Sequence, residues 1–104
     1  LYGALEAYDQ CVATFDKALK AKKLPELLVR RGLCKKAGGD PDGAIRDFQE
    51  ALNMDAEYAP AHLYLGITFQ EQGKKAEAKR ALSDAARYGE GKIKEQADKA
   101  LGEL

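Results

Sequence analysis

Few side chains in this sequence could act in catalysis or metal binding, and they do not cluster. His62 is the single histidine, and no cysteine or second histidine lies three or four residues from it. A metal site needs several ligands at such spacings, and one histidine alone makes no catalytic site. We therefore expect His62 to be a helix-surface or packing residue.

The two cysteines allow three kinds of chemistry. Cys11 and Cys34 are 23 residues apart and lack the Cys-x-x-Cys spacing. They could act as nucleophiles, bind a metal or form a disulfide. Both fall at small-residue positions of expected helices, and cysteine is among the residue types most often buried. We expect both to be reduced and buried by packing.

Nucleophile and phosphate-binding motifs are missing. Ser83 is the only serine and no Gly-x-Ser-x-Gly surrounds it, and the glycines form neither type of phosphate loop. Asp40–Gly43 looks like the start of a calcium loop, but Ala51 occupies the position of its final glutamate. We interpret that segment as a helix start. The sequence thus predicts no enzyme, no metal site and no cofactor.

The composition indicates which elements position these residues. Among 104 residues, 18 are alanine and only seven are valine, isoleucine or threonine. Alanine favours helices and β-branched residues favour strands, so we expect one all-α domain. The 17 basic and 17 acidic residues cancel, which argues against binding to nucleic acid or anionic lipid. No apolar run approaches the roughly 20 residues of a membrane span.

Internal repetition with a period of 34 residues is the strongest signal. Glycine, alanine and arginine recur in register, and apolar positions follow them. The identical pairs are Gly32 and Gly66, Gly39 and Gly73, Ala44 and Ala78, Arg46 and Arg80, and Ala51 and Ala85.

Each unit reads as two helices joined by a turn. Proline at a first helical position and glycine after the last one mark the boundaries. The expected helices cover residues 25–38, 41–54, 60–72, 76–88 and 92–104, preceded by one near the N-terminus.

This pattern resembles the tetratricopeptide repeat, a 34-residue helix–turn–helix unit. The first full unit matches the family's small and apolar positions at Leu28, Gly32, Ala44, Phe48 and Ala51, and the second at Leu65, Gly66, Phe69, Ala78, Leu82 and Ala85. Departures are Arg31 and Lys35 where Leu and Tyr are usual, His62 in place of Trp, and Ala56 and Glu90 in place of Pro.

The resemblance implies an organisation and a fold. We expect a right-handed superhelix of stacked antiparallel helix pairs, an all-α solenoid. Residues 1–24 would supply the second helix of a partial repeat plus a linker, so that this chain is a piece of a longer protein. Two repeats would follow at 25–58 and 59–91, with a solvating capping helix at 92–104.

The resemblance also implies a non-enzymatic module that binds a protein or peptide on its concave face. Carrying over the family's groove positions predicts a partner-binding set of Val29, Arg30, Leu33, Lys36, Leu63, Tyr64, Ile67 and Gln70. A neighbouring repeat, the first helix or a second copy could instead cover this strip. The clamp that some members use for acidic chaperone C-termini is absent where it can be checked, because Val29, Leu33, Pro60 and Tyr64 occupy its positions.

The alternative function is a structural scaffold that self-associates through exposed solenoid ends. A homodimer could form through the N-terminal helix, whose apolar residues include Leu5, Tyr8, Val12 and Phe15. The partner's identity and the compartment are not encoded in these patterns, although the cytoplasm is slightly favoured.

Overall fold

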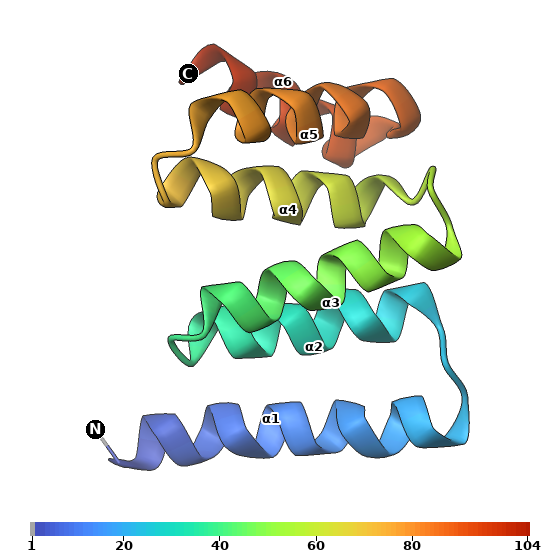
Figure 1. Cartoon of the computed structure of the whole chain (residues 1–104), viewed down its shortest axis with the longest axis vertical. Coiled ribbons are helices and arrows are strands. Elements are labelled where there is room, and N and C mark those ends of the chain that lie inside the picture. Colours follow the sequence, from blue (N-terminus) through green and yellow to red (C-terminus); the bar gives the residue numbers. More distant parts are fainter. Residues whose placement is uncertain (1) are drawn as a thin grey trace.

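The computed structural model describes the backbone of residues 2–104 and the side chains from Glu6 onward. Six helices follow one another along the chain and pack in sequence, as Figure 1 shows. None of these described helices is long and apolar enough to cross a membrane. The helices are α1 Tyr2–Ala21, α2 Pro25–Ala37, α3 Pro41–Met54, α4 Ala59–Glu71, α5 Lys75–Tyr88 and α6 Gly91–Gly102.

The helix boundaries have local causes that the sequence predicts. Pro25, Pro41 and Pro60 lie in first helical turns, where the missing N–H breaks no bond. Asp40 caps α3, because its side chain accepts a hydrogen bond of 2.9 Å from the N–H of Gly43.

The two turns inside the helix pairs are equivalent. Gly39 and Gly73 both adopt positive φ, at 95° and 78°, a region open to glycine at no steric cost. Near the N-terminus, α1 runs to Ala21, and a linker at 22–24 leads to α2.

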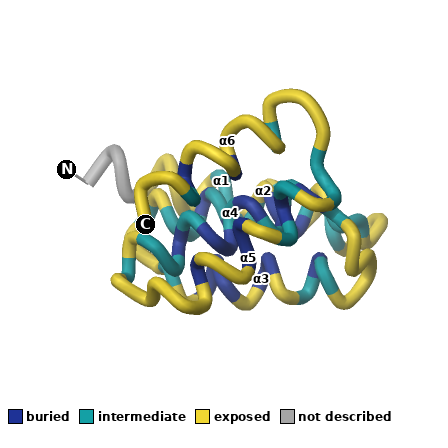
Figure 2. The backbone as a smooth tube through the Cα atoms, turned by 90° about the horizontal axis from the view of Figure 1, so that it is seen from above, coloured by how far each residue is buried: buried dark blue, intermediate teal, exposed yellow. Residues whose placement is uncertain are grey.

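The helices form two layers, which are visible from above in Figure 2. One layer holds α2, α4 and α6, and α4 contacts both of its neighbours there. The other layer includes α3 and α5, whose Cα atoms nowhere approach within 8 Å of each other. Closer spacing in the layer of α2, α4 and α6 makes it the inner side of a curved stack. We call this surface the even-helix face.

The core consists of two apolar clusters between the layers. Phe48 is completely buried at the centre of the first, which joins α2, α3 and α4. Leu82 and Leu63 are completely buried in the second, which joins α4, α5 and α6. Burying each such side chain contributes about 1.5–3 kcal/mol, so stacking stabilises the stack more than any single pair could.

The helices of each pair cross where the inner one carries glycine. A Cβ atom added to Gly66 would lie 2.6 Å from Cγ of Leu82, and one added to Gly32 would lie 2.6 Å from Cε1 of Phe48. Real Cβ atoms do not approach so closely, so a larger residue at either position must displace the Phe48 or Leu82 side chain.

We expect Gly66→Leu to lower the free energy of unfolding by about 1–3 kcal/mol, because it overpacks the contact with Leu82. Urea denaturation followed by circular dichroism measures the change. Gly102→Leu is the matched control, because no atom lies within 4 Å of a Cβ placed there. Equal midpoints for both variants would contradict the packing described.

Candidate functional site

The eight residues of the predicted partner-binding set lie on α2 and α4, but two of them are core residues. Val29 is 4% exposed and Leu63 is fully buried, so neither side chain reaches a partner. Their assignment to the partner-binding set is therefore wrong. Leu63 packs beside Leu82 and Ala97, because α6 covers that side of α4.

The other six remain at the surface to different degrees. Arg30 is exposed, whereas the remaining side chains are half-buried. These half-buried residues are Leu33, Lys36, Tyr64, Ile67 and Gln70.

A groove of about 430 Å³ runs between α4 and α6 on the even-helix face. Ile67 and Ala100 give it an apolar floor, and its rim is polar. The rim residues are Gln70, Glu71, Gln96, Lys99 and Glu103. Sequence reasoning missed the contribution of α6, because it treated 92–104 as a solvated cap. The available signal was the spacing of Gln96, Lys99 and Ala100, which places them on one side of that helix.

An ion pair links α2 and α4, which are neighbours on the even-helix face. Nζ of Lys36 lies 2.7 Å from Oε1 of Glu71, joining α2 to α4. Both groups reach solvent, so the pair contributes only about 0–1 kcal/mol. The pair places Lys36, which was predicted to select partners, beside Glu71 at the rim of the groove.

His62 is a packing residue, as the sequence predicts. Its Nε2 atom lies 2.8 Å from the carbonyl oxygen of Ala56, and its ring stacks on Tyr88 with centroids 5.8 Å apart. Asp84 lies 4.0 Å from Nδ1. Within the described side chains, no group of three or more His, Cys, Asp and Glu residues could hold a metal ion.

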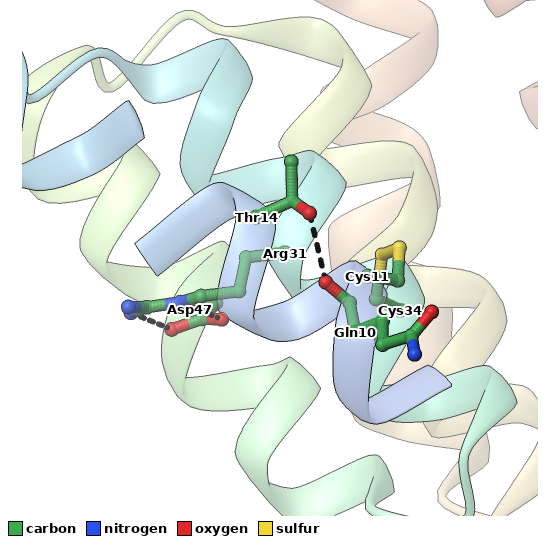
Figure 3. Close-up of a disulfide and its surroundings, with 6 residues drawn as sticks. All are labelled: Gln10, Cys11, Thr14, Arg31, Cys34 and Asp47. Carbon is green, nitrogen blue, oxygen red and sulfur yellow. Dashed lines mark hydrogen bonds and ion pairs between the residues drawn. A yellow bond between two sulfur atoms is a disulfide. The ribbon is translucent and has the colours of Figure 1, made fainter. Parts of the chain in front are cut away.

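The cysteines contradict the expectation of two reduced thiols. Cys11 on α1 and Cys34 on α2 form a disulfide, shown in Figure 3, with Cα atoms 5.9 Å apart. That Cα separation is within the usual range for a disulfide. The sequence could not show this, because spacing along the chain does not say which helix faces pack together.

An ion cluster around one buried carboxylate lies near the disulfide, and Figure 3 shows its Arg31–Asp47 pair. Asp47 of α3 is 2% exposed and accepts two hydrogen bonds from Arg31, at 2.9 and 2.7 Å. Nζ of Lys35 lies 3.2 Å from the same carboxylate. Asp16 of α1 accepts a hydrogen bond of 2.8 Å from Arg31. The hydrogen bond to Asp47, aided by that to Asp16, raises the pKa of the Arg31 guanidinium.

This cluster explains two departures from the repeat pattern. Arg31 and Lys35 occupy positions where the next repeat, 34 residues on, carries Leu65 and Phe69. The partner of both cations, Asp47, corresponds to an alanine there. One repeat thus uses ions where the other uses apolar contacts, and the carboxylate neutralises the charge that would otherwise be buried.

The exposed seam predicted on α1 is only partly described. The side chain of Leu5 lies outside the described residues. Tyr8 is 37% exposed, and Val12 and Phe15 are half-buried. None of the described side chains of α1 is buried.

Comparison with known proteins agrees with the repeat and the paired helices. The profile of the tetratricopeptide repeat family matches residues 36–101. A probable UDP-N-acetylglucosamine–peptide N-acetylglucosaminyltransferase SPINDLY from Hordeum vulgare is 36% identical over 73 residues, which cover 68% of this chain but 8% of that protein. So small a share transfers no activity. The helix pairs, the 34-residue register and the match to the family profile show that the chain belongs to the tetratricopeptide repeat family. Domains of this family are in general protein-interaction modules.

Proposed function

We propose that this chain is a non-enzymatic module that binds a peptide in the groove between α4 and α6. The groove itself carries the proposal, because it opens on the face that holds Ile67 and Gln70, both predicted to contact a partner. At about 430 Å³, it has room for a few residues of a peptide.

The lining favours an extended segment with a small apolar side chain. Ile67 and Ala100 form a floor suited to that side chain. On either side, the carboxamides of Gln70 and Gln96 each donate and accept hydrogen bonds, as a peptide main chain requires. The rim holds Lys99 as well as acidic groups, so binding does not depend on one sign of charge. Arg30 and Leu33 on α2 extend the surface beyond the groove.

The test is a selection of peptides from a random library on the natural chain, followed by affinity measurements on variants. We expect Gln70→Ala combined with Gln96→Ala to lower the affinity for the selected peptides at least tenfold. Both side chains line the groove and neither belongs to the apolar clusters, so folding should be unchanged.

The matched control changes two exposed residues of α3, Arg46→Ala and Gln49→Ala. Peptides should bind this control within twofold of the natural chain. A second variant, Leu33→Glu with Ile67→Glu, should abolish binding. Both side chains pack against the apolar clusters, so circular dichroism must first show that this variant keeps its helices. Equal binding to the groove variant and the α3 variant would move the site elsewhere.

A further inference from the structure

A second hollow, of about 190 Å³, lies between α3 and α5 over the other side of α4. Leu65 and Phe69 of α4 form its base, whereas Ile67 and Gln70 of the same helix line the groove on the even-helix face. Its walls are the third, fourth and fifth of the six helices, so neither end of the stack forms it. We call this hollow the outer pocket.

The outer pocket has an apolar floor and a charged rim. Two floor residues are buried and two are half-buried, and together they are Leu52, Leu65, Phe69 and Ala81. The rim residues are His62, Glu77, Arg80 and Asp84. The space suits one large apolar side chain, and such pockets commonly hold the anchoring side chain of a binding partner.

A related cavity lies one repeat earlier, between α1 and α3. Three pairs of lining residues are 34 positions apart, namely Leu28 and His62, Arg31 and Leu65, and Glu50 and Asp84. In the earlier cavity, Arg31 joins α1 to α3 through hydrogen bonds to Asp16 and Asp47. Leu65 and Ala81 stand at the positions of Arg31 and Asp47 in the outer pocket. Its base is therefore apolar and lacks this bridge.

The two cavities also differ in how a rim carboxylate is neutralised. Glu50 of the earlier cavity forms an ion pair with Lys23 of the linker before α2. Asp84 takes the place of Glu50 in the outer pocket, and the residue 34 positions after Lys23 is Glu57. Among the described side chains, Asp84 has only His62 as an ion-pair partner, at 4.0 Å. The outer pocket thus lacks the lysine that the chain supplies to the earlier cavity.

The remaining rim charges leave an acidic excess. Glu77 and Arg80 are exposed on α5, and neither forms an ion pair with another described side chain. With Asp84, the rim has two carboxylates and one guanidinium. A cation beside the pocket therefore complements this rim better than an anion does.

We infer that the outer pocket binds a peptide of a partner protein that carries a large apolar residue flanked by lysine. The apolar side chain covers the floor, and a lysine lies beside Asp84 as Lys23 lies beside Glu50. This surface is separate from the groove between α4 and α6, so its test does not depend on the function proposed above.

The probe is the acetylated and amidated pentapeptide Ala-Lys-Leu-Lys-Ala, titrated into the isotope-labelled natural chain. We expect saturable amide chemical-shift changes centred on Leu52, Leu65 and Ala81, which line the pocket on three helices. Two control peptides, Ala-Lys-Ala-Lys-Ala and Ala-Glu-Leu-Glu-Ala, should bind at least fivefold more weakly. The first lacks the apolar anchor and the second reverses the charge.

The variant Glu77→Gln with Asp84→Asn should lower the affinity for the probe at least fivefold. Neither side chain belongs to an apolar cluster, so folding should be unchanged. The matched control, Glu90→Gln with Glu95→Gln, removes two exposed carboxylates outside the pocket and should bind within twofold of the natural chain. Arg80→Ala should raise the affinity about twofold, because it removes a like charge.

Three results would overturn the inference. The first is no saturable shift with the lysine–leucine peptide, and the second is equal affinity for the pocket variant and its matched control. The third is tighter binding of the glutamate peptide, because the rim would then select an anion through Arg80.

Discussion

Asp47→Ala is expected to lower the free energy of unfolding by about 3 kcal/mol. The change leaves Arg31 and Lys35 without their shared buried carboxylate, and losing one partner of a buried pair costs about 3–5 kcal/mol. The lower end applies because Arg31 keeps Asp16 and both cations reach some water. Guanidinium denaturation measures the difference.

A rescue variant separates the ion cluster from the site itself. Arg31→Leu, Lys35→Phe and Asp47→Ala together copy the apolar residues of the second repeat. We expect the free energy of unfolding of this triple variant to match or exceed that of the natural chain, because an apolar set of similar volume avoids the desolvation of three charges. Asp16→Ala, at an exposed carboxylate, should cost less than about 1 kcal/mol. If Asp47→Ala left the free energy of unfolding unchanged, the cluster would not hold α2 to α3.

The second large effect concerns the disulfide. Reducing the bond between Cys11 and Cys34 is expected to lower stability by about 3 kcal/mol, the loop-closure value for residues 23 apart. Thermal melts with and without dithiothreitol measure the loss. The variant Cys11→Ser with Cys34→Ser should melt at the same temperature as the reduced chain, and dithiothreitol should not change that temperature.

Hydrogen exchange locates the effect of reduction. None of the described α1 side chains is buried, so α1 should lose protection while α3 and α4 keep theirs. A native chain whose two thiols react at once with Ellman's reagent would contradict the bond and restore the sequence expectation. Such bonds persist in oxidising compartments, so this titration also bears on where the protein works.

Much of the fold was predictable from local patterns. The 34-residue register, the prolines that open helices and the turn glycines Gly39 and Gly73 each act within a few residues. The close approach at Gly32 and Gly66 was predictable too, because the repeat places glycine opposite a large residue in both units.

The candidate site was less predictable, because exposure depends on what packs over a helix. Val29 and Leu63 lie one helical turn before Leu33 and Ile67 in the predicted groove, yet neighbouring helices cover the first two. Residues of α6 complete the groove, and nothing local to α4 indicates them.

The sequence by itself determined the helices, their pairing and the family, because helix starts, stops and apolar periodicity are properties of neighbouring residues. Only the tertiary structure decided that Cys11 meets Cys34, that Asp47 neutralises Arg31 and Lys35, and that Val29 and Leu63 are buried. The physical reason is that these outcomes depend on the rotation of one helix against the next. That rotation is set by packing among residues distant in the chain, which no local pattern records.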